Sequence, residues 1–111
     1  MSASDQPIGR PRVVCLCGST RFKDAFIAAN RSETLEGRIV LSVGMFGHDE
    51  GIDMNGPIKV NLDELHKRKI DLADEVLILN VGGYVGESTK SEIEYAQRHG
   101  KPLRWLETPS V

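Results

Sequence analysis

Glu75-Val76-Leu77-Ile78-Leu79-Asn80-Val81 is a stretch with four large aliphatic residues in a row. A strand with one face in water alternates apolar and polar residues, whereas a strand covered by helices on both faces is apolar throughout. The unbroken run therefore predicts a central strand over Glu75–Val81, in a sheet that is buried on both sides.

Strands and helices alternate on either side of this run. Apolar runs bounded by turn residues predict the other strands, and apolar residues at helical spacing predict the helices. The predicted strands are Arg12–Cys17, Arg38–Val43, Glu75–Val81 and Pro102–Leu106, and the predicted helices lie around Phe22–Ala29, over Ile58–Ala73 and over Thr89–His99. Such alternation implies right-handed crossovers and a parallel sheet. We expect a small Rossmann-like, three-layer α/β sandwich with four or five strands.

The helix predicted over Ile58–Ala73 is amphipathic. Leu62, Leu65 and Leu72 form its apolar side, and the basic stretch Lys67–Lys69 lies beside them. A short basic stretch without interleaved aromatic residues is typical of a solvated helix face. We therefore interpret this basic stretch as a solvated helix face.

The length of the chain, 111 residues, suits one domain. We expect this domain to span residues 12–107, between loose tails at 1–11 and 108–111. The charges nearly balance, with 14 basic and 16 acidic residues. A nucleic acid polymer and a membrane surface are therefore not expected as partners. Because residues 1–11 hold no apolar stretch typical of a secretion signal, we expect a cytoplasmic protein.

Three connections meet at the edge of the sheet where parallel strands end, and ligands of such sheets bind there. They are residues 18–21, 45–56 and 80–89. The loop after Met45 faces this edge and is expected to influence specificity. The candidate substrate-binding residues are Gly18, Ser19, Thr20, Arg21, Met45, Phe46, Asn80, Gly82, Gly83, Gly86, Ser88 and Thr89.

The first connection places one glycine and two hydroxyl groups before a helix. Free N–H groups and the positive end of the helix dipole favour an anion such as phosphate at that position. Ser19 or Thr20 capping the helix is an equally open interpretation. In the third connection, the glycines allow the backbone to approach a ligand, and Ser88 and Thr89 supply hydroxyls where a helix starts.

Glu92 falls in the first turn predicted for the third helix. The helix dipole would keep it ionised there, as a carboxylate nucleophile must be. Thr89-x-x-Glu92 is also the spacing of a capping box, in which Glu92 reaches back to a backbone N–H. The spacing alone favours the capping box.

Metal binding is not expected. Cys15 and Cys17 point to the same face of a strand, and the sequence places no histidine beside them, so we interpret them as core residues. The run His48–Glu50 offers ligand types, but His66 and His99 fall on other elements and no ligand spacing emerges.

Three blocks of the sequence resemble the nucleoside 2-deoxyribosyltransferase superfamily, which also contains the 2′-deoxynucleoside 5′-monophosphate N-glycosidases. The blocks are Cys17-Gly18-Ser19-Thr20-Arg21, Ala73-Asp74-Glu75-Val76-Leu77-Ile78, and Tyr84-Val85-Gly86-Glu87-Ser88-Thr89 continuing through Glu92-Ile93, Tyr95-Ala96 and Gly100-Lys101-Pro102. The similarity spans about residues 13–106, and the last block is its most specific part.

This resemblance implies a flavodoxin-like domain that cleaves or transfers an N-glycosidic bond through a covalent glycosyl–carboxylate, without a cofactor. It matches Glu92 to the nucleophile and Asp74 to a residue that orients the sugar and assists the nucleophile. It places the turn at Gly18–Arg21 and the region of Ser88 around a 5′-phosphate or sugar. The family carries a tyrosine on the first strand where this chain has Cys15, and we assign Tyr84 as its catalytic substitute.

The resemblance also implies that the partner is a nucleoside or nucleoside monophosphate and that the chain forms a homodimer or larger homo-oligomer. One alternative is a binding module that holds a nucleotide in the same cleft without breaking a bond. Another is a protein-interaction domain that has kept only the fold.

Overall fold

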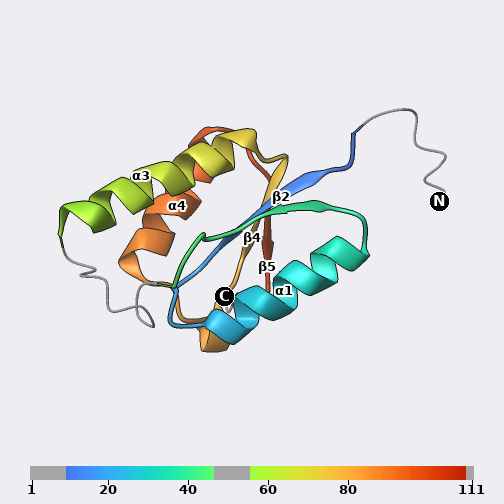
Figure 1. The fold of residues 1–111 in the computed structure, drawn as a ribbon, viewed down its shortest axis with the longest axis horizontal. Coiled ribbons are helices and arrows are strands. Elements are labelled where there is room, and N and C mark those ends of the chain that lie inside the picture. Colours follow the sequence, from blue (N-terminus) through green and yellow to red (C-terminus); the bar gives the residue numbers. More distant parts are fainter. Residues whose placement is uncertain (1–9, 47–55, 110–111) are drawn as a thin grey trace.

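The computed structural model describes residues 10–46 and 56–109 (Figure 1). Its elements follow the alternation that the sequence predicts. The strands are β2 (Val13–Cys17), β3 (Ile39–Leu41), β4 (Glu75–Ile78) and β5 (Leu103–Trp105), and the helices are α1 (Lys23–Leu35), α3 (Pro57–Leu72), the short 3-10 helix η1 (Val81–Gly83) and α4 (Glu87–Arg98). In this part of the chain, no helix is both long and apolar enough to cross a membrane.

The four strands form one parallel sheet in the order β3-β2-β4-β5. Cys15 lies opposite Val76, which in turn lies opposite Leu103. Every residue of β2 and β4 is buried, as the apolar runs predict for central strands. The predicted α/β class, with a flavodoxin-like or Rossmann-like parallel sheet, is confirmed.

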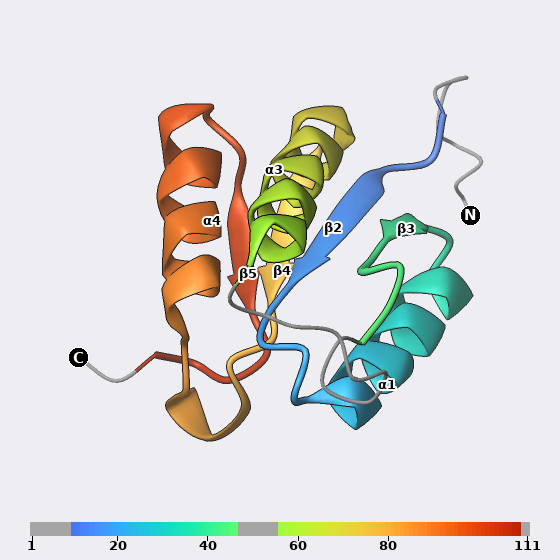
Figure 2. The same ribbon diagram turned by 60° about the vertical axis from the view of Figure 1, so that its left-hand side comes forward.

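Helices cover both faces of the sheet and give three layers (Figure 2). On the α1 face, the core consists of Val14, Leu16, Phe26, Ala29, Leu77 and Leu79. On the face covered by α3 and α4, it consists of Val13, Cys15, Cys17, Ile70, Ala73, Val76, Ile78 and Ala96. Cys15 and Cys17 therefore share a face and a core, as predicted.

The face of α3 that the sequence predicts to be buried is not the face that the structure buries. Leu65 is 54% exposed and Leu72 is 68% exposed, whereas His66 and Ile70 are buried. The helix therefore turns a face that includes a histidine toward the sheet. A polar residue at a core position interrupts the apolar spacing on which the prediction depends.

Two boundaries near the predicted site also differ from the prediction. β4 ends at Ile78 rather than Val81, because residues 81–83 form a 3-10 turn in which Gly82 has a φ of 63° and Gly83 a φ of 83°. Those left-handed angles suit glycine and are incompatible with an extended strand. Helix α4 begins at Glu87, two residues before the predicted start, and Gly86 is its N-cap.

A network of ion pairs joins α1 to the sheet. The side chains of Glu33 and Glu75 are each only 8% exposed. Arg104 of β5 donates to both, with an Nη2–Oε1 distance of 2.6 Å to Glu33 and an Nε–Oε1 distance of 2.7 Å to Glu75. Arg12 also donates to Glu75, at 2.9 Å. Burial of both carboxylates makes their arginine partners necessary.

We expect Glu75→Gln to lower the free energy of unfolding by about 1–3 kcal/mol, because hydrogen bonds to a charged group are lost while the shape is kept. Urea unfolding followed by circular dichroism measures the change. The matched control is Glu94→Gln, which neutralises an exposed glutamate on α4. Equal stability of the two variants would contradict a stabilising role for the network.

Candidate functional site

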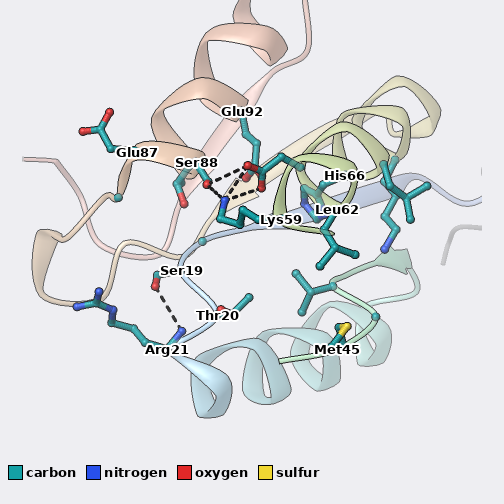
Figure 3. Close-up of a pocket in the computed structure, with 18 of the residues that line it drawn as sticks. Ser19, Thr20, Arg21, Met45, Lys59, Leu62, His66, Glu87, Ser88 and Glu92 are labelled. Carbon is teal, nitrogen blue, oxygen red and sulfur yellow. Dashed lines mark hydrogen bonds and ion pairs between the residues drawn. The ribbon is translucent and has the colours of Figure 1, made fainter. Parts of the chain in front are cut away.

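A pocket of about 500 Å³ lies beyond the carboxyl ends of the strands, between the turn after β2 and the helices α3 and α4 (Figure 3). This volume is in the range of small-molecule sites. Its lining consists of Gly18, Ser19, Thr20, Arg21, Val43, Gly44, Met45, Lys59, Leu62, Asp63, Leu65, His66, Lys69, Tyr84, Gly86, Glu87, Ser88, Thr89 and Glu92.

The turn after β2 forms one side of the pocket. A Cβ atom at Gly18 would lie 3.0 Å from the Cβ of Leu79, so a larger residue would force Leu79 to shift where β2 leaves the sheet. The hydroxyl of Ser19 accepts a hydrogen bond from the Arg21 N–H at 3.3 Å. The N-cap of α1 is Phe22, with no side-chain capping bond among the described residues, so the proposed capping role of Ser19 or Thr20 is wrong.

Glu92 lies in the opposite wall, on α4. Because this helix starts at Glu87, Thr89 is its third residue rather than its N-cap, and Glu92 falls in the second turn. The capping-box interpretation of Thr89 and Glu92 is therefore wrong. Glu92 is only 7% exposed, and it faces the pocket on the same side as His66 (Figure 3).

The environment of Glu92 changes its acidity. Burial raises the pKa of Glu92 to about 7, and the charge of His66 and a hydrogen bond from Cys17 limit the increase. The expectation that the helix dipole keeps this carboxyl fully ionised is therefore wrong, because the loss of hydration is the larger effect. Near neutral pH, Glu92 is divided between its ionised and protonated forms.

Helix α3 supplies a set of pocket residues that the sequence prediction missed. The ammonium group of Lys59 donates to both carboxylate oxygens of Asp63, at 2.9 and 2.7 Å, and to the hydroxyl of Ser88. Ser88 in turn donates to Asp63 at 3.3 Å, which ties α3 to α4. The i, i+4 spacing of Lys59 and Asp63, continued by His66 at i+7, is the signal that could have identified this face.

His66 joins the two cysteines beneath the pocket. Its Nε2 lies 3.5 Å from each of the Cys15 and Cys17 sulfur atoms and donates to the carbonyl oxygen of Leu16 at 2.9 Å. The expectation that no histidine lies beside the cysteines is therefore wrong. We refer to Cys15, Cys17 and His66 as the thiol–imidazole cluster.

The two thiols of this cluster differ in acidity. The hydrogen bond from Cys17, together with His66, lowers the pKa of Cys15 to about 6 although burial opposes the change. The same bond and burial raise the pKa of Cys17. A low thiol pKa beside a histidine is typical of reactive or metal-binding cysteines.

Tyr84 lies at the edge of the pocket and is 42% exposed. The guanidinium of Arg21 lies 4.6 Å from the centre of its ring, and the ring of Phe22 meets it edge-on at 5.8 Å. The structure therefore pairs Tyr84 with the turn after β2 in the lining of the pocket.

Four of the predicted binding residues lie outside the pocket lining and have structural contacts. Asn80 donates to the Glu107 carbonyl at 2.8 Å and accepts from its N–H at 3.0 Å. The N–H of Gly82 bonds the Glu107 carboxylate at 2.8 Å, and Gly83 follows in the same turn. Phe46 packs edge-on against Phe26 in the α1 core, at 5.6 Å. The run His48–Glu50 lies outside the described residues.

Asp74 lies at the other end of the sheet, immediately before β4. Its carboxylate accepts two hydrogen bonds from Arg10, at 2.8 and 3.0 Å, and one from the N–H of Val13 at 2.8 Å. The bond from Arg10, followed by that from Val13, lowers the pKa of Asp74 to about 2. Because Glu92 faces the pocket beyond the opposite ends of the strands, the structure does not place Asp74 beside it.

We expect Asp74→Asn to be less stable than the wild type at pH 7. The folded pKa of about 2 lies below the ordinary value of 3.8, so the carboxylate stabilises the fold above that value and loses its contribution as the pH falls toward 2. Urea unfolding at pH 7, 4 and 2.5 measures the difference, with Glu94→Gln as the control. A difference that stays constant with pH would contradict this ion pair.

Comparison with protein-family models, curated proteins and solved structures finds no match to this chain. The functional interpretation therefore rests on the residues that line the pocket.

Proposed function

We propose that this chain cleaves or transfers the N-glycosidic bond of a small nucleoside or nucleoside 5′-monophosphate, with Glu92 as the nucleophile. One observation carries the proposal. The carboxyl group of Glu92 is buried in the pocket wall, opposite the turn at Gly18–Arg21, and has no part in capping its helix.

The chemistry needs one carboxylate and an enclosed site. A carboxylate oxygen of Glu92 bonds to C1′ as the C1′–N bond breaks, and the base leaves with that electron pair and takes up a proton. Water or a second base then attacks C1′ and releases the carboxylate, which gives hydrolysis or transfer. A pKa of about 7 leaves a large ionised fraction of Glu92 at neutral pH for this step.

The rest of the lining suits the parts of such a substrate. Val43, Met45 and Leu62 offer apolar contact to a base. Arg21 and Lys59 are cationic, and Ser88 lies in the first turn of α4, where helices favour anions. These groups are suited to bind a 5′-phosphate, and we place the phosphate of the proposed substrate beside them.

Glu92→Gln tests the nucleophile. The amide keeps the size of the side chain but cannot form the glycosyl ester, so we expect the rate of base release to fall by at least about 100-fold. Chromatography of the free base measures this, from a panel of ribo- and deoxyribonucleosides and their 5′-monophosphates. Glu94→Gln, on the exposed side of the same helix, should keep the wild-type rate.

The same panel separates the other interpretations. Full turnover by Glu92→Gln would overturn the nucleophile assignment. Calorimetric binding of a nucleotide by the wild type, with no base released, would favour a binding module. No binding of any member of the panel would favour a protein-interaction domain.

Arg21→Ala tests the position of the phosphate. We expect KM for a 5′-monophosphate to rise about 10-fold, as for the loss of one charge-assisted hydrogen bond, with a smaller change for the nucleoside. Arg31→Ala is the control, because Arg31 lines a separate surface hollow on α1. Equal effects of Arg21→Ala on nucleoside and monophosphate would contradict a phosphate contact at this residue.

A further inference from the structure

We propose that the thiol–imidazole cluster of Cys15, Cys17 and His66 binds a zinc ion beneath the pocket. Their ligand atoms all lie within 4.8 Å of one another, although the residues come from two separate elements. Two thiolates and an imidazole are a donor set that selects zinc over magnesium or calcium. This proposal does not depend on the proposed glycosidic reaction.

The backbone holds this arrangement in place. Cys15 and Cys17 are two residues apart on β2, so both side chains point toward α3. β2 is paired on both sides, with β3 and β4, which holds the backbone of the two cysteines in place. His66 comes from the buried face of α3, next to Ile70 in the core.

The two nitrogen–sulfur distances match those that zinc requires. Zn–S bonds of about 2.3 Å and Zn–N bonds of about 2.0–2.1 Å at a tetrahedral angle separate sulfur from nitrogen by about 3.6 Å. Nε2 of His66 lies 3.5 Å from each of the two sulfur atoms. Because Nε2 also lies 2.9 Å from the Leu16 carbonyl oxygen, an ion that contacts all three groups replaces this hydrogen bond, and the imidazole shifts away from the carbonyl as the ion binds.

Binding changes the protonation of the cluster. Nε2 of His66 carries a hydrogen in this structure, because it donates to the carbonyl of Leu16. Zinc displaces that hydrogen and any hydrogen that the thiols still hold, since only the deprotonated forms are ligands. The imidazole then carries its hydrogen on Nδ1, and the released protons enter the solvent.

The cluster supplies three protein ligands and leaves a fourth position for water or a ligand atom. Three protein ligands with one open position are typical of catalytic zinc, whereas structural zinc has four. The cysteines are fully buried, while His66 and Glu92 line the pocket. The route for an ion to the cluster is therefore through the pocket wall that His66 and Glu92 form.

Metal titration of the full chain tests the site. The chelator-treated protein is titrated with Co²⁺, and then with Zn²⁺ by calorimetry. We expect one equivalent of Co²⁺ to produce a thiolate-to-cobalt charge-transfer band in the near ultraviolet, and Zn²⁺ to abolish it. Cys15→Ser and His66→Gln should weaken zinc binding by more than about 100-fold, beyond the range for loss of an outer-shell partner.

His99→Gln is the matched control, because His99 is an exposed histidine at the C-cap of α4. It should bind zinc like the wild type. Absence of the charge-transfer band in the folded wild-type protein would overturn the proposal, as would unchanged affinity in Cys15→Ser. If the variants do not fold, zinc-edge X-ray absorption of the loaded wild type decides, because it must show two sulfur neighbours. Base release is not needed for any of these measurements.

Discussion

The pairing of β2 with β4 is the constraint on which the rest of the molecule depends. Val14 to Cys17 lie in register with Glu75 to Ile78, and every residue of both strands is buried. The strands remain in contact beyond the ladder, since the Leu79 N–H donates to the Cys17 carbonyl at 2.8 Å. This close approach favours glycine at position 18, because a Cβ atom there would crowd Leu79, and Gly18 is the first residue of the turn that lines the pocket.

The succession of strands and helices along the chain could be predicted from the sequence, but the polar residues that face the core could not. Apolar runs identified β2 and β4 correctly, because burial on both faces leaves a direct compositional signal. The inner face of α3 could not be predicted in this way, since His66 occupies a core position where leucine would be expected. The pocket residues of α3 were missed for the same reason.

The boundary of α4 and the position of Asp74 account for two further differences at the site. A helix start two residues earlier than predicted moves Glu92 from the first to the second turn and removes its capping role. Asp74 precedes a parallel strand, so its end of the sheet is opposite to the ligand edge, and contacts with Arg10 and Val13 account for its carboxylate. Neither error affects the fold, because capping and terminal ion pairs act locally.

The hydrogen bonds between the Asn80 side chain and the Glu107 backbone restrain one rim of the pocket. Asn80 opens the connection that carries Tyr84 and Gly86, and two hydrogen bonds to the backbone of Glu107, with a third from Gly82, fasten that connection to the segment after β5. One rim of the pocket is thus restrained before any ligand arrives. A restrained rim has little conformational entropy left to lose, so the last described residues of the chain favour binding of the proposed substrate without contacting it.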